Sequence, residues 1–276
     1  MEYYLTLAGL PIKLYTPAEI TISDSLRPFL TEAREKVACA ISVQVVKSLP
    51  AVSEGGLWHG AEYHTPEGVV HCLGRGDTPF AFTAFSEEDV TICVLPEFTH
   101  YFSGNEGIFN RIGLETWLQK HHGLLLHASI IMYKDRAIAF AGPSGVGKST
   151  QAELWHKTLG AKVINGDRAA LRKTENGWFA YGSPYAGTSG IYCNDSAPLT
   201  AVVVLSQGQE NVLTKLPPVD ALGKLYPEIS SHPWDKSFTE ATADLCLELI
   251  ADVPVYGFAC KNDNSAPLAL KKGLNL

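Results

Sequence analysis

The chain has 276 residues, of which 46% are hydrophobic and 18% charged, and its net charge is −7. This hydrophobic content is enough for a sizeable core in one or two domains and argues against a disordered chain. The acidic balance disfavours nucleic acid as a partner, but it does not disfavour a nucleotide, whose phosphates need only one local cluster of backbone N–H groups.

The first residues, Met1 to Tyr4, lack the basic start and apolar run of a signal peptide, and no stretch is long enough to span a bilayer. The six cysteines are scattered without a Cys-x-x-Cys pair, which argues against a zinc site. We therefore expect a cytoplasmic protein with free, buried thiols and no membrane partner.

Residues 1–105 are expected to form a small β-rich domain. Short apolar runs are separated there by glycine, proline and acidic turns, at 39–46, 69–73, 80–85 and 90–95. Turn-forming residues then cluster at 102–107, so we place a domain boundary between residues 105 and 106.

Residues 106–276 are expected to form an α/β domain, because strand and helix patterns alternate along them. The helices are predicted at 108–121, 148–159, 240–251 and 267–272. The third of them is expected to begin with a capping box made by Ser237 and Glu240. The strands are predicted at 124–132, 136–141, 162–165, 201–205 and 253–259, with a turn at 133–135.

A phosphate-binding loop lies between the strand at 136–141 and the helix at 148–159. Residues 142–149 match the pattern Gly-x-x-x-x-Gly-Lys-Ser/Thr without a mismatch. Its glycines permit positive φ, so that backbone N–H groups can surround phosphates, and the helix directs its positive end at the same anion. The alternative is a glycine-rich turn that binds nothing, and the flanking strand and helix argue against it.

The side chains of this loop have separate expected roles. Lys148 supplies positive charge to the β and γ phosphates, and Ser149 offers a hydroxyl to Mg²⁺. The residues expected to bind the nucleotide are Gly142, Pro143, Ser144, Gly145, Val146, Gly147, Lys148, Ser149 and Thr150.

Asp167 is the expected catalytic carboxylate. The strands at 136–141 and 162–165 are joined by a helix, so they should run parallel and end at the same edge of the sheet, where ligands bind. Asp167 follows the second strand, and its carboxylate is placed to bind Mg²⁺ or to accept a proton from an attacking hydroxyl. The alternative is a simple turn aspartate in Asn165-Gly166-Asp167. The strand at 202–205 has no acidic residue at its end, unlike motor-type ATPases.

From residue 123 onward the sequence resembles the catalytic domain of the HPr kinase/phosphorylase family. The resemblance rests on Leu125-Leu126-His127-Ala128-Ser129, on the loop at 142–149 and on the stretch from Gly160 to Asp167. It is closer still to shorter bacterial relatives described as HPr-kinase-like or phosphoenolpyruvate-carboxykinase-like. The resemblance does not include the N-terminal half.

This resemblance implies a P-loop kinase domain with a twisted mixed sheet, which uses ATP and Mg²⁺ to phosphorylate a serine hydroxyl. It also implies a catalytic role for His127, whose alternative is a hydrogen-bonded core residue. The family has two adjacent aspartates where this chain has Gly166 and Asp167. The family forms hexamers, so self-association is a further expectation.

A glycine-rich stretch at 181–190 falls where the family places its substrate-facing segment. Ser183, Thr188 and Ser189 are candidates for contacts with a phosphate or an acceptor, and a plain surface loop is the alternative. Arg168 is a candidate for stabilising charge on the transferred group, or else a surface ion-pair residue. The segment 231–235 is read either as a ligand contact or as a turn between helices.

Three functions follow in order of preference. The first is a kinase that transfers the γ-phosphoryl group of ATP to a hydroxyl of a peptide, small protein or small molecule. The second is a nucleotide-binding regulator or scaffold with little catalysis, because one family carboxylate is missing. The third, carboxykinase chemistry, needs an Arg- and Lys-rich oxyacid pocket that the sequence does not show.

Overall fold

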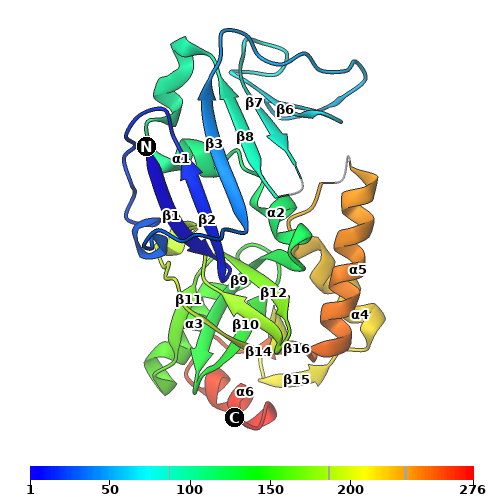
Figure 1. Ribbon diagram of the computed structural model, residues 1–276. Coiled ribbons are helices and arrows are strands. Elements are labelled where there is room, and N and C mark those ends of the chain that lie inside the picture. Colours follow the sequence, from blue (N-terminus) through cyan, green and yellow to red (C-terminus); the bar gives the residue numbers. More distant parts are fainter. Residues whose placement is uncertain (87, 186, 233–234) are drawn as a thin grey trace. The chain divides into compact units, whose positions relative to one another are not determined.

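The computed structural model describes all residues of the chain except 87, 186, 233 and 234, and all their side chains except that of residue 188. The chain divides into two compact units, residues 1–114 and 115–276, and each is built on a mixed eight-stranded sheet (Figure 1). The expected α/β class with a mixed sheet is confirmed. The expected boundary at residue 105 falls inside the first unit, where the Asn105 side chain accepts a hydrogen bond from the backbone N–H of Ser23 at 2.6 Å.

The sheet of the first unit has the strand order β1-β2-β3-β8-β7-β6-β5-β4. Its strands are β1 (Glu2–Leu7), β2 (Leu10–Tyr15), β3 (Cys39–Val45), β4 (Leu57–His59), β5 (Glu62–Thr65), β6 (Gly68–Cys72), β7 (Pro79–Phe85) and β8 (Val90–Val94). The four apolar runs found in the sequence are β3, β6, β7 and β8. The β1–β2 hairpin was not predicted, because its turn is formed by Ala8 and Gly9, both at positive φ, and alanine is not a typical turn residue.

The helix expected at 108–121 is two helices, so that prediction was wrong. They are α1 (Asn105–Phe109) and α2 (Leu114–Lys120). Gly113 between them has φ of 55°, a left-handed conformation that ends a helical run. Ile108, Ile112 and Trp117 are all buried, so the apolar side chains on both sides of this break face the core.

The sheet of the second unit has the order β10-β9-β12-β13-β14-β16-β15, with β11 paired to β9. Its strands are β9 (Gly123–Tyr133), β10 (Arg136–Ala141), β11 (Lys162–Asn165), β12 (Arg168–Thr174), β13 (Gly177–Tyr181), β14 (Ser196–Gln207), β15 (Val212–Lys215) and β16 (Val255–Cys260). The helices that follow α2 are α3 (Lys148–Leu159), α4 (Pro218–Leu225), α5 (Lys236–Asp252) and α6 (Ser265–Gly273).

The strand β9 lies between the P-loop strand β10 and the strand β11 that leads to Asp167. Both strands pair antiparallel with β9, so they run parallel to each other without being neighbours. On its other side β10 pairs in parallel with β14, which pairs in parallel with β16. The carboxyl ends of β10, β11, β14 and β16 therefore lie at one edge of the sheet, as expected for the first two.

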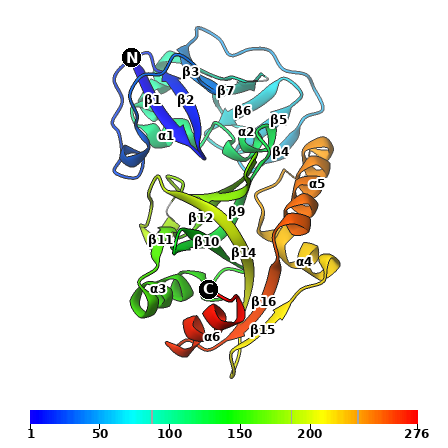
Figure 2. The ribbon, with the colours of Figure 1, turned by 60° about the horizontal axis from the view of Figure 1, so that its bottom comes forward.

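Helices cover both faces of this sheet, and Figures 1 and 2 show α4 and α5 on the side opposite α3 and α6. One core cluster joins the sheet to Ala221 and Leu225 of α4 and to Leu249 of α5. The other joins it to Trp155 of α3 and Leu270 of α6. Within the described residues, no helix combines the length and the apolar character needed to cross a bilayer.

The helix α5 begins earlier than expected and with a different cap. Its N-cap is Asp235, whose carboxylate accepts a hydrogen bond from the backbone N–H of Phe238 at 3.0 Å. Ser237, the expected cap, instead donates its hydroxyl to Asp235 at 2.8 Å. Aspartate competes well for the cap because its charged oxygen also interacts favourably with the helix dipole.

Candidate functional site

The P-loop leaves β10 at the carboxyl edge of the sheet and leads into α3. Gly142, Gly145 and Gly147 have φ of 133°, 80° and 113°, conformations that side-chain-bearing residues rarely adopt. Within the loop, the backbone N–H of Val146 donates to the carbonyl of Pro143 at 3.2 Å. Gly142 packs against the backbone of Leu205 on β14, where an added Cβ would lie 3.3 Å from the Leu205 carbonyl oxygen.

The amino terminus of α3 fits an anion. Gly147 is its N-cap, and no side chain hydrogen-bonds to this end of the helix. The first backbone N–H groups of a helix have no partner within it, and they carry the positive end of the helix dipole. Because no capping side chain occupies these donors, they remain available to phosphate oxygens.

Lys148 is the one charged side chain held inside this loop among the described residues. The residue is 7% exposed, and its ammonium donates to the carbonyl of Gly142 at 2.6 Å and to that of Pro143 at 3.3 Å. Burial lowers the pKa of Lys148, and the negative charges of Glu228 and Asp167 oppose this shift. The two carboxylates are therefore close enough to act electrostatically on the lysine of the P-loop.

Ser149 lies beside the turn that carries Asp167. Its hydroxyl donates to the carbonyl of Gly166 at 3.4 Å, and the same carbonyl accepts a bond from the Ser129 hydroxyl at 3.0 Å. The two side chains expected to hold Mg²⁺ are therefore both next to Gly166: Ser149 donates to its carbonyl, and Asp167 follows it in the chain. No group of three or more His, Cys, Asp or Glu side chains in the described part of the chain forms a metal site by itself.

The turn that carries Asp167 is fixed by the buried side chain of Asn165. Its Oδ1 accepts the backbone N–H of Asp167 at 2.9 Å, and its Nδ2 donates to the carbonyls of Ser183 and Tyr185 at 3.2 and 3.1 Å. The carbonyl of Asp167 accepts the N–H of Ala128 on β9. The Asn-Gly turn weighed as an alternative is therefore present, and it holds a carboxylate that is 31% exposed.

His127 lies between two carboxylates. Its Nε2 is 3.5 Å from Asp167 Oδ1, an ion-pair distance, and its Nδ1 is 3.2 Å from Glu228 Oε2. The ring is 35% exposed, so His127 is hydrogen-bonded but lies only partly in the core. Glu228 was not singled out in the sequence, because it is 101 residues from His127 and has no motif around it.

The backbone explains how Glu228 reaches His127. Glu228 ends a short 3₁₀ turn, Tyr226–Glu228, and the next residue, Ile229, forms an antiparallel bridge with Leu126 of β9. The N–H of Ser230 also donates to the carbonyl of Leu125 at 2.9 Å. In an antiparallel pairing, Ile229 opposite Leu126 places Glu228 opposite His127.

The glycine-rich segment at 181–190 packs directly on the Asp167 turn. A Cβ added to Gly187 would lie 2.5 Å from the Asp167 carboxyl carbon, and one added to Gly166 would overlap the Ser189 side chain. Ser183 is 3% exposed and its hydroxyl donates to the Arg168 carbonyl, so it holds the turn in place. The side chain of Thr188, another candidate contact, lies outside those described.

The remaining candidates are Arg168 and the segment 231–235. Arg168 is exposed on β12, where its backbone pairs opposite His127. His232 Nε2 donates to Glu115 Oε1 at 2.8 Å and its ring stacks on Phe238, so it supports the start of α5. Residues 233 and 234 of the same segment lie outside the described part of the chain.

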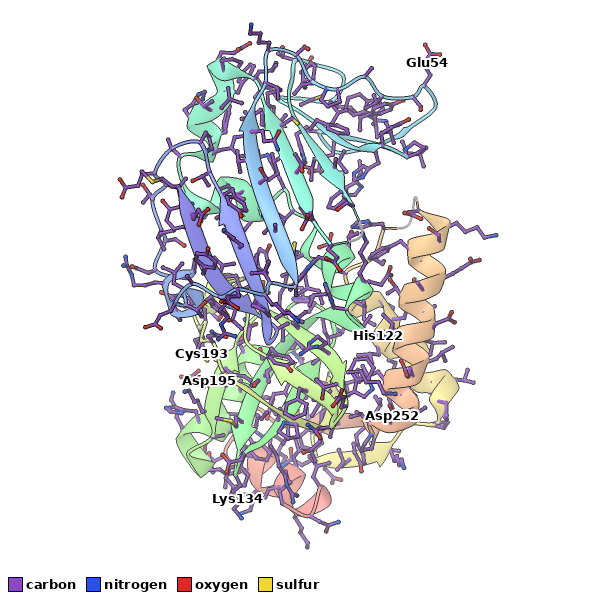
Figure 3. The ribbon with its side chains drawn as sticks, in the orientation of Figure 1. Glu54, His122, Lys134, Cys193, Asp195 and Asp252 are labelled. Carbon is purple, nitrogen blue, oxygen red and sulfur yellow. The ribbon has the colours of Figure 1, made fainter. Side chains whose placement is uncertain are left out.

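Two aspartates of this unit have lysine partners. Asp195 is 2.7 Å from Lys162, and Asp252 is 2.8 Å from Lys173; both aspartates are labelled in Figure 3. These pairs are partly exposed and belong to the surface, where ion pairs contribute little. Asp167 and Glu228 differ from these two aspartates because each lies beside the ring of His127.

No protein-family model matches this chain, and no curated protein matches it. Among solved structures, it is similar to the Hpr(Ser) kinase/phosphatase from Coxiella burnetii, with 12% sequence identity and a TM-score of 0.32. That match covers 55% of this chain and 88% of the other.

Proposed function

We propose that this chain is a kinase that transfers the γ-phosphoryl group of ATP to a hydroxyl acceptor. The observation that carries the proposal is the convergence of three elements at one sheet edge. They are the uncapped amino terminus of α3 with Lys148 in its loop, the hydroxyl of Ser149, and the carboxylate of Asp167 in contact with His127.

Each group has a role in this proposal. The backbone N–H groups of the loop and Lys148 bind the β and γ phosphates. Ser149 and Asp167 would hold Mg²⁺, with phosphate oxygens and water as its other ligands, and the bound ion would neutralise negative charge on the phosphates. Asp167 accepts the proton of the attacking hydroxyl, and His127 lies at its carboxylate.

Each bond formed in this transfer is matched by a bond that breaks, and these groups accept the proton and the leaving group's charge. The acceptor oxygen forms a bond to the γ-phosphorus while its O–H bond breaks and the proton goes to Asp167. The bond between the γ-phosphorus and the bridging β–γ oxygen breaks, and ADP leaves with that electron pair. Because little covalent work falls to the protein, catalysis depends on positioning and charge stabilisation.

The test is phosphotransfer from labelled ATP in the presence of Mg²⁺. Candidate acceptors are serine- and threonine-containing peptides, small proteins and small molecules that carry a hydroxyl. Label in an acid-stable phosphoester, lost in the Lys148→Ala variant, is the expected result. Tight ATP binding without transfer to any acceptor would count against the proposal.

A second function has one observation in its favour, the packing of Gly166. The missing carboxylate of the resembled family cannot simply be added, because Ser189 occupies the space of a side chain at residue 166. A nucleotide-binding regulator would need no second carboxylate. The paired variant Gly166→Asp with Ser189→Gly separates the two functions: transfer that appears only in this variant would identify the natural chain as a binder.

A further inference from the structure

The turn at 261–264, which joins β16 to α6, lies at the same edge of the sheet as the P-loop. Ala141 at the end of β10 pairs with Val204 of β14. Beyond that point β14 continues beside β16 as far as Gln207, which lies opposite Cys260. The turn is therefore two strand positions away from the P-loop strand, a separation of roughly 10 Å.

The side chain of Gln151 connects the P-loop helix α3 to this turn. The residue is 3% exposed, and its Nε2 donates to the carbonyl of Lys261 at 3.1 Å and to Cys260 Sγ at 3.4 Å. Because a carbonyl only accepts hydrogen bonds, the amide must direct its nitrogen toward Lys261 and its oxygen away. That Oε1 is buried, and no donor in the described part of the chain bonds to it.

A buried acceptor without a donor is uncommon in folded proteins, where nearly all buried polar atoms are hydrogen-bonded. The Gln151 oxygen lies in the first turns of the helix whose amino terminus is proposed to bind phosphates. A ligand that extends from the P-loop toward the 261–264 turn can supply the donor. A nucleotide has this shape, because its base is joined to the phosphates through the ribose.

The turn also carries an exposed amide that is not used to hold it in place. The backbone N–H of Lys261 donates to Asn211 Oδ1 at 2.9 Å, and the N–H of Ser265 donates to Asp263 Oδ1 at 2.8 Å. These bonds fix the two ends of the turn. Asn262 lies between them, and among the described residues its exposed side chain has no hydrogen-bond partner.

We propose that the base of the bound nucleotide lies on the 261–264 turn, where the amides of Gln151 and Asn262 select adenine. This inference rests on the proposed function, because it requires a triphosphate in the P-loop. A carboxamide carries a donor and an acceptor side by side, and so does the edge of adenine, with its amino group and a ring nitrogen. Guanine has a carbonyl where adenine has the amino group, so the Gln151 oxygen would face a second acceptor.

The test measures binding to the full chain by titration calorimetry with Mg²⁺ and three probes. The probes are ATP, GTP and ribose 5-triphosphate, which keeps the phosphates and the sugar but lacks the base. The wild type is expected to bind ATP roughly 2- to 10-fold more tightly than GTP, the range that corresponds to one hydrogen bond. It is also expected to bind ATP more tightly than ribose 5-triphosphate, because only ATP contacts the turn.

Two variants remove the amides separately. Asn262→Ala and Gln151→Met are each expected to weaken ATP binding by roughly 2- to 10-fold and to leave ribose 5-triphosphate binding within about 2-fold. Asn176→Ala, in the exposed turn between β12 and β13, is the matched control and should behave as wild type. If Gln151→Met weakens the binding of both probes, the P-loop itself has been distorted, and the exposed Asn262 decides the outcome alone.

Equal affinity of the wild type for ATP and ribose 5-triphosphate would overturn the proposal while leaving phosphate binding by the P-loop in place. Tighter binding of GTP than of ATP would overturn the selection of adenine. An Asn262→Ala variant that binds ATP as tightly as the control would overturn the role of the turn. If the wild type binds none of the three probes, the proposed kinase function fails as well.

Discussion

The side chain of Ser189 fills the space that a side chain at residue 166 would occupy: a Cβ added to Gly166 would overlap the Ser189 hydroxyl and its Cβ. Gly166 is buried, and its carbonyl accepts hydrogen bonds from Ser129 and Ser149. A turn that joins the P-loop helix to the Asp167 carboxylate is therefore packed so closely that only glycine fits.

We predict that Gly166→Asp alone destabilises the protein by about 1–3 kcal/mol, because the new side chain overpacks against Ser189 and the turn must move. Adding Ser189→Gly removes the overlapping atoms and should recover most of this loss. Chemical denaturation of the two variants and of Ser189→Gly alone measures the coupling. Equal stability of Gly166→Asp and wild type would show that the 187–189 turn adapts without cost.

Lys148→Ala is predicted to weaken ATP binding by roughly 10- to 150-fold, the loss expected for hydrogen bonds to a charged donor worth about 1.5–3 kcal/mol. The side chain is buried in the loop, where its ammonium donates to the carbonyls of Gly142 and Pro143. Titration calorimetry with ATP and Mg²⁺ measures the affinity. Lys157→Ala on the exposed face of α3 is the control, and an equal loss in both variants would contradict the assignment.

Asp167→Asn is predicted to leave ATP affinity within a few-fold of wild type while lowering kcat by about 10²–10⁴-fold, the range expected for a lost general base. The amide keeps the shape of the side chain but cannot accept the proton of the attacking hydroxyl. Single-turnover transfer from labelled ATP separates this step from product release. Asp244→Asn, on the exposed face of α5, controls for a general effect of lost charge.

The first unit is predicted to lose stability in acid because of Glu62. Burial alone would raise the pKa of its carboxyl, but interactions with His64 and His71 outweigh it and hold the pKa well below its usual value of 4.5. A carboxyl whose pKa is lower in the folded state than in the unfolded state stabilises the folded state above about pH 4.5. This stabilisation is lost as the pH falls below that value.

Glu62→Gln tests this dependence. The stability difference between wild type and variant should be largest near neutral pH and should shrink as the pH falls below about 4.5. Denaturation midpoints of both proteins at several pH values supply the measurement. A difference that stays constant across this range would show that Glu62 contributes only through neutral hydrogen bonds.

Features that depend on one short stretch of residues were predicted from the sequence, whereas features that depend on particular contacts were not. The P-loop, the strand β10 and the helix α3 were predicted at their observed bounds, because one continuous stretch carries their glycines, lysine and apolar spacing. The start of α5 was misplaced, because Asp235 and Ser237 are both good caps and only the observed hydrogen bond distinguishes them. The apolar residues of the 108–121 region have the spacing of a single helix, but the structure has two helices there. Gly113 ends the first helical run, while the apolar side chains on both sides of it are buried.

The sequence by itself determined the glycine-rich loop at 142–149, the mixed α/β class and the placement of Asp167 after a strand parallel to β10. Those features depend on backbone conformations and on strand direction, which short stretches of residues specify. Only the tertiary structure decided that β9 separates the two strands, that Glu228 meets His127 and that Ser189 closes the space at Gly166. These are contacts between segments distant in the chain, and packing in three dimensions selects them.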